Sequence, residues 1–265
     1  MSAEPERRPW AALASGTAVG ALGGLIGLGG AEFRLPLLLS VFRFAPLEAI
    51  ILNKATSLIV VVSALAFRTR NVPIAEVLAH TGIVVNLLVG SLLGAWLGAS
   101  WATRMRTTTL YKVIAVLLVA IAAVLLFGHD VNGSAGAALT EWRLWIAGAA
   151  AGLIIGIVAS LLGVAGGELL IPTFVLLFGI DIKLAGSLSL VVSLPTMLVG
   201  FARYSRDRSF AVLTRHKGFL AWIAVGSIVG TFIGALLLGY ASPAILIPLL
   251  TLILLISALQ VWRHT

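Results

Sequence analysis

Apolar runs of about twenty residues recur along the whole chain and constrain its fold more than any other feature. Clear examples are Ile83–Ser100, Leu144–Leu162 and Phe219–Tyr240. A helix of about 20 apolar residues crosses a bilayer, and within the lipid it satisfies its own backbone hydrogen bonds. Only 11% of the residues are charged, against about 25% in soluble domains. We therefore expect an all-α polytopic membrane protein.

The sequence also matches itself, without a gap, at an offset of 136 residues. Eight of the twelve glycines between Trp10 and Gly128 align with another glycine. Glu32 aligns with Glu168 in the same register. We therefore divide the chain into two membrane repeats, 1–130 and 131–265. Secondary transporters are often built from such repeats, but channels and some membrane enzymes are too, so the repeat alone does not decide the function.

The predicted membrane segments follow the same order in both repeats. They are Trp10–Leu28, Phe33–Phe42, Leu47–Phe67, Ile74–Trp101 and Leu110–Phe127, then Leu144–Leu162, Leu169–Phe178, Lys183–Ala202, Phe210–Leu238 and Ala244–Val261. The sequence leaves open whether the short segments 33–42 and 169–178 cross the membrane or re-enter it. Residues 74–101 are expected as one long, tilted helix, because their length exceeds a bilayer core of about 30 Å.

The basic residues favour an inverted arrangement of the two repeats. We place the N-terminus in the cytoplasm and give each repeat an odd number of crossings. Twelve Lys and Arg residues then lie in the cytoplasm and four outside, as the positive-inside rule prefers. Arg68 and Arg70 oppose this assignment. We therefore expect a multi-pass protein of the cytoplasmic (inner) membrane, with two inverted repeats and broken or re-entrant helices, and no nucleic-acid partner despite the net charge of +8.

Each repeat contains a glycine-rich break followed by Glu and Pro, GLGGAEFRLP at 27–36 and GVAGGELLIP at 163–172. Glycine allows unusual backbone conformations and proline lacks an amide hydrogen, so we expect Pro36 and Pro172 to mark the point where one helix ends and another starts. A helix start presents unpaired amides and partial positive charge, which suits an anion. The amides expected to bind it belong to Gly29, Gly30, Ala31, Gly166 and Gly167.

The two acidic residues of the breaks, Glu32 and Glu168, allow more than one interpretation. A carboxylate within a membrane segment is costly and usually functional. Each residue either carries a coupling H⁺ or helps to hold Na⁺, or it caps the new helix. The glycines of the long fourth segment are expected to pack helices closely instead; they are Gly82, Gly90, Gly94 and Gly98.

Polar residues follow each break by about twenty positions, where hydroxyls and an amide on one helix face would bind an oxyanion. They are Asn53, Lys54, Thr56 and Ser57 in the first repeat and Ser187, Ser189 and Ser193 in the second. The alternative for each hydroxyl is a bond to its own helix. Lys54 and Arg34 align with Leu190 and Leu170, so each either balances an anion, pairs with an acid or reaches an interface. We expect no catalytic residues, metal site or bound cofactor.

Together these motifs resemble the sulfite exporter TauE/SafE family of membrane proteins. The resemblance rests on GLGGAEFRLPLLL and GVAGGELLIPTFV, each followed by NKATSL or SLSLVVSLP. It implies a secondary transporter of sulfite, sulfoacetate or related organosulfonates, working by alternating access at a midplane site. The expected partners are a small anion and the lipid bilayer; the oligomeric state is open, with a homodimer among the options. A small-anion channel and an integral-membrane lipid-phosphate enzyme are the alternatives.

Overall fold

All regular structure that the computed structural model describes is helical. The described residues are 9–26, 30–68, 74–127, 141–237 and scattered positions between 252 and 262. Within them, five helices are long and apolar enough to cross a membrane. The prediction of an all-α polytopic membrane protein is therefore confirmed. The expected segment Ala244–Val261 lies largely outside the described residues.

The helices divide into two series along the chain. The first consists of α1 (Pro9–Ile26), α2 (Ala31–Ser40), α3 (Pro46–Arg68), α4 (Ile74–Ala79), α5 (Thr81–Ala102) and α6 (Thr107–Phe127). The second consists of α7 (Glu141–Leu162), α8 (Gly167–Phe178), α9 (Ile182–Tyr204), the 3₁₀ turn η4 (Arg208–Ala211), α10 (Val212–Arg215) and α11 (Lys217–Leu237). Under the 136-residue shift, both ends of α3 fall on the ends of α9, and the start of α5 falls on the start of α11.

The expected 28-residue helix over Ile74–Trp101 is wrong, because the helix is interrupted at His80. The backbone of His80 (φ −104°, ψ 18°) leaves the helical region, and its Nδ1 lies 2.9 Å from the Glu76 carbonyl oxygen. A side chain that engages a nearby carbonyl competes with the helical hydrogen bond. His216, at the equivalent position, also leaves the helical region (φ −121°, ψ 36°) and interrupts the predicted segment Phe210–Leu238, but its Nδ1 has no hydrogen-bond partner among the described residues.

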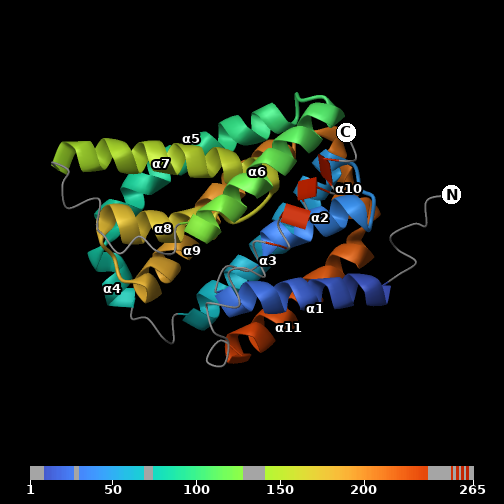
Figure 1. Cartoon of the computed structure of the whole chain (residues 1–265), viewed down its shortest axis with the longest axis horizontal. Helices are drawn as coiled ribbons and strands as arrows, with labels where there is room; N and C mark the ends of the chain where they lie inside the picture. Colours follow the sequence, from blue (N-terminus) through green and yellow to red (C-terminus); the bar gives the residue numbers. More distant parts are fainter. Residues whose placement is uncertain are drawn as a thin grey trace.

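The helices α1 and α11 lie side by side at the lower edge of the molecule (Figure 1). They touch through glycine: a Cβ at Gly16 would overlap the carbonyl oxygen of Ile223, and one at Gly20 would overlap that of Ser227. Because both residue numbers rise together, the two helices run in the same direction. Such close backbone contact through small residues is how membrane helices associate.

The helices α5 and α7 form an equivalent parallel pair at the upper edge (Figure 1). A Cβ at Gly90 would overlap the Ala149 carbonyl oxygen, and one at Gly94 would overlap that of Leu153. The prediction that these glycines serve packing is therefore confirmed for Gly90 and Gly94, and Gly98 makes a similar contact. It is wrong for Gly82, because a Cβ there would meet no atom within 4 Å.

The helices α3 and α9 contact each other and form the centre of the bundle between these two pairs. The apolar window of α3 is 61% buried and that of α9 56% buried, against 39% for both α7 and α11. Large apolar side chains on the outer helices stay exposed, among them Leu93, Ile146, Ile154 and Phe232. An apolar exterior around a more buried centre is the arrangement expected in lipid.

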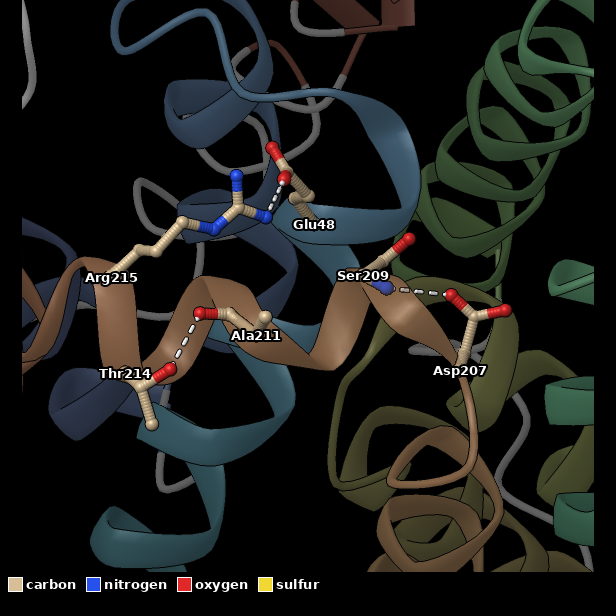
Figure 2. A network of polar contacts seen from close by, with 6 residues as sticks. All are labelled: Glu48, Asp207, Ser209, Ala211, Thr214 and Arg215. Carbon is tan, nitrogen blue, oxygen red and sulfur yellow. Dashed lines mark hydrogen bonds and ion pairs between the residues drawn. The ribbon is translucent and has the colours of Figure 1, made fainter.

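A set of polar contacts fixes η4 and α10 against the start of α3 (Figure 2). Arg215 forms an ion pair of 3.0 Å with Glu48 of α3. Asp207 accepts a hydrogen bond of 2.8 Å from the amide of Ser209 and so begins the 3₁₀ turn. The side chain of Phe219, in the first turn of α11, packs edge-on to Phe42. The short helices therefore join the end of α9 to the start of α11.

Candidate functional site

Both glycine-rich breaks start a short helix inside the bundle. The residues that precede α2 and α8, Gly30 (φ 67°) and Gly166 (φ 83°), are in the left-handed conformation that favours glycine. Gly30 is also held against α1, where a Cβ would overlap the Val19 carbonyl oxygen. At about 1.5 Å per residue, the ten residues of α2 cover about 15 Å, half of a bilayer core. Gly29 lies outside the described residues.

The two prolines do not mark the break, and that prediction is wrong in position. Pro36 and Pro172 are each the sixth residue of a continuing helix. A proline lacks the amide that would donate to the carbonyl four residues earlier. Those carbonyls belong to Glu32 and Glu168, so each proline removes the helical partner of the acidic residue one turn before it.

The side chain of Asn53 on α3 joins the two breaks. Its Nδ2 donates to the carbonyl of Ala31, the first residue of α2, at 2.9 Å. The same nitrogen donates to the carbonyl of Leu162, the last residue of α7, at 3.0 Å. A helix end leaves carbonyls without a partner, and Asn53 supplies one for Leu162. One buried amide therefore holds the end of α7 against the start of α2.

Arg34 completes this network from α2. Its Nη1 donates to Oδ1 of Asn53 at 3.3 Å and to Oγ of Ser57 at 3.2 Å. All three side chains are buried. The structure therefore brings three residues of the expected site together, but as partners of one another. Leu170 stands at the equivalent position of the second series, where Ser193, the counterpart of Ser57, has no partner among the described residues.

The carboxyl groups of Glu32 and Glu168 meet at the two helix starts. They come from α2 and α8, both are buried, and they are close enough for a hydrogen bond between the two side chains. Apart from the backbone amides of Glu32 and Glu168 themselves, no donor group of the described residues bonds the four carboxyl oxygens. The two acidic residues that the 136-residue register aligns are therefore neighbours in space.

A second centre surrounds Lys54, which follows Asn53 on α3. The Lys54 side chain is completely buried, and its Nζ has no hydrogen-bond partner among the described residues. A Cβ added at Gly200 of α9 would lie 3.0 Å from this nitrogen and 2.8 Å from Oγ of Ser160 on α7. The Ser160 hydroxyl is likewise buried without a described partner. The absence of a side chain at Gly200 thus lets the ammonium and the hydroxyl both lie against the backbone of α9.

The other predicted hydroxyls divide into two kinds. Thr56 donates to the Leu52 carbonyl at 2.9 Å, and Ser189 donates to the Gly186 carbonyl at 2.9 Å, so both bond their own helices. Ser187 and Ser193, on α9, are buried, and neither hydroxyl has a partner in the described part of the chain. Only the second pair keeps its hydrogen-bonding capacity for a ligand.

Sequence reasoning did not identify Ser160 and Gly200 as site residues. Ser160 lies within the apolar run of α7, and Gly200 within that of α9. The 136-residue alignment holds a signal for them, because Gly24 and Ala64 stand at the equivalent positions. Lys54 also departs from the repeat, since Leu190 is its counterpart. All three positions around the buried ammonium are therefore places where the two series differ.

Buried charges and two helix starts inside a bundle of spanning helices define a multi-pass membrane protein with an internal polar centre. The family model for sulfite exporter TauE/SafE matches residues 11–261, nearly the whole chain. The chain belongs to this family, which makes it a membrane transporter of sulfite or related anions. No curated protein and no solved structure matches the chain.

Proposed function

We propose that the protein is a secondary transporter of small sulfur oxyanions, sulfite, sulfoacetate or related organosulfonates, across the cytoplasmic membrane. The anion binds between the two breaks, and the site opens to each side in turn. Helix amides at Gly30, Ala31, Gly166 and Gly167 face it, with Lys54 as the counter-charge and Ser160, Ser187 and Ser193 as further donors. Either H⁺ or Na⁺ supplies the driving gradient.

The unpartnered ammonium of Lys54 is the observation that supports this proposal most strongly. A buried charge without a partner is strongly unfavourable, because neither water nor a counter-ion stabilises it. A negatively charged ligand removes that cost. The adjacent Ser160 hydroxyl adds a donor, and Gly200, which has no side chain, lets both groups lie close together against α9. A sulfonate or sulfite group offers several oxygens on one centre, which matches an ammonium and a hydroxyl set close together.

The helix directions support inverted repeats, on which alternating access depends. Trp10 and Trp222 pack at 6.1 Å, so α1 and α11 begin at the same end of the bundle. Arg203, at the end of α9, donates to Ser100, near the end of α5, at 2.8 Å. The ends of α9 and α5 therefore lie on the same side of the bundle. Because α11 follows α9 along the chain, α11 starts on the side where α5 ends. Since α1 runs with α11 and α7 runs with α5, the first helices of the two repeats run in opposite directions.

Ligand-induced stabilisation tests the substrate class. The purified full chain is heated in detergent with sulfite, sulfate, taurine, sulfoacetate or simple carboxylates, each with and without Na⁺. Binding to the folded state raises the melting temperature, and the rise grows with the logarithm of ligand concentration divided by the dissociation constant. We expect the sulfur oxyanions to stabilise it most. Stabilisation by carboxylates or cations alone contradicts the proposed substrate class.

A pair of matched variants tests the role of Lys54. Lys54→Gln removes the buried ammonium, whereas Lys112→Gln removes an exposed one. We expect Lys54→Gln to reduce anion affinity at least tenfold, equivalent to about 1.4 kcal/mol, and Lys112→Gln to leave it unchanged. In proteoliposomes, flux that saturates with anion and depends on an ion gradient identifies a transporter, whereas non-saturating flux down the anion gradient identifies a channel.

A further inference from the structure

Two carboxyl groups in contact lack the donor that their geometry requires. An ionised carboxylate only accepts hydrogen bonds, whereas a protonated one carries one O–H donor. Glu32 and Glu168 meet within reach of one another, and apart from their own backbone amides no described group donates to their oxygens. Two ionised carboxylates held together in an apolar interior repel each other, and both lose their hydration. One proton between them supplies the missing donor and removes one of the two charges.

The balance of buried charge gives this proton a role. Four charged side chains are buried among the described residues: Glu32 on α2, Glu168 on α8, Arg34 on α2 and Lys54 on α3. The other elements packed against α2 or α8, which are α1, α6, α7 and α9, contribute no buried charged side chain in their described parts. With all four side chains ionised, the two positive and two negative charges sum to zero. A bound anion would then give the site a net negative charge. With one proton on the pair, the site carries a net positive charge that an anion offsets.

We propose that Glu32 and Glu168 act as one carboxyl pair that shares a single proton, and that this proton and the anion bind together. The inference rests on the proposed function, because it needs an anion at the internal site. The proton stays on the glutamate oxygens, and no covalent bond forms or breaks. Binding linkage is reciprocal, so the proton raises anion affinity by the same factor by which the anion raises proton affinity. The transporter is then driven by protons, and Na⁺ has no role.

Infrared spectroscopy tests the shared proton without any substrate. At about pH 8 the exposed acidic residues are ionised, so a protonated carboxyl stretch reports a buried acid. We expect this band in the purified full chain and its loss in the double variant Glu32→Gln/Glu168→Gln. Glu76→Gln, a change at an exposed acid on α4, should leave it intact. Absence of the band from the unmodified protein overturns the proposal and does not depend on whether the double variant folds.

Calorimetry tests the linkage with sulfoacetate as the probe. The protons taken up per anion bound follow from the change in binding enthalpy between buffers of different ionisation enthalpy. The titrations are run above the pH at which the infrared band disappears, so that the pair is ionised before the anion binds. Under these conditions we expect about one proton in the unmodified protein and in Glu76→Gln, and about zero in Glu168→Gln. Sulfoacetate binding without proton uptake, or with a requirement for Na⁺, overturns the proton pair but leaves the proposed function standing. Failure of every sulfur oxyanion to bind overturns the proposed function, and the coupling with it.

Discussion

The side chain of Asn53 donates a 3.0 Å hydrogen bond to the carbonyl of Leu162, 109 residues away in sequence. The bond connects the centre of α3 to the end of α7. Because the same nitrogen also serves the start of α2, this amide fixes the relative position of the two breaks. The positions of both helix starts therefore depend on one side chain of the first series.

Replacement of Asn53 by alanine should destabilise the protein. It leaves the buried carbonyl of Leu162 without its donor, at a cost of about 1–3 kcal/mol. The Ala31 carbonyl loses the bond that ties it to α3 but keeps its helical partner within α2. The free energy of unfolding in mixed detergent micelles measures the effect. Thr56→Val is the matched control, because the Thr56 hydroxyl bonds only its own helix. Equal effects of the two changes contradict the bridging role of Asn53.

Replacement of Gly94 by alanine should separate α5 from α7. The added methyl overlaps the Leu153 carbonyl oxygen. This oxygen is a backbone atom and cannot rotate away as the end of a side chain could. We expect a loss of about 1–3 kcal/mol in the free energy of unfolding, as for other overpacked contacts. Gly82→Ala, on the same helix, meets no atom within 4 Å and should have little effect. An unchanged free energy of unfolding for Gly94→Ala would contradict this prediction, because it would mean that α5 and α7 move apart at little cost.

Replacement of Gly200 by alanine should reduce anion affinity while the fold persists. The new methyl lies beside the ends of two side chains, Lys54 Nζ and Ser160 Oγ, which can move a few tenths of an ångström. The ammonium and the hydroxyl are then displaced from the positions in which they would bind the anion. We expect a fall in affinity of about tenfold in the thermal-shift titration, equivalent to about 1.4 kcal/mol. Unchanged affinity places the anion elsewhere.

The membrane orientation can be measured with single cysteines, because the natural chain contains none. Arg104→Cys and Ser205→Cys replace exposed residues near the ends of α5 and α9, and Arg143→Cys replaces one near the start of α7. In intact cells, a membrane-impermeant maleimide should label position 143 but not 104 or 205. In inside-out vesicles the pattern should reverse. Labelling of all three from the same side contradicts the inverted arrangement.

Sequence reasoning located the spanning segments and the glycine breaks well, for physical reasons. Apolar length reports a membrane span directly, and a carboxylate beside clustered glycines is too costly in lipid to be incidental. Gly30 and Gly166 accordingly adopt the left-handed conformation that the motif indicated. The family resemblance is confirmed by a match over nearly the whole chain.

The parts that sequence reasoning missed depend on contacts across helices. The interruption at His80 follows no change in apolar pattern, because the segment is apolar on both sides of it. At His216 the flanking Arg215 and Lys217 were a signal that the predicted segment Phe210–Leu238 did not use. The helices tolerate Pro36 and Pro172, so the glycines alone set the helix starts. The sequence suggests anion ligands at three polar residues, Asn53, Arg34 and Ser57. In the structure their side chains form hydrogen bonds with one another instead. Ser160 becomes part of a site only because α3 brings Lys54 beside it.

The glycine contacts tie each half of the chain to the other half. The α1–α11 pair takes one helix from each series, and so does the α5–α7 pair. A fragment that contains only the first series would expose the glycine faces of α1 and α5 to lipid, with no backbone to pack against. We therefore expect each half, expressed alone, to be stable only when a second copy of itself or the other half covers these faces.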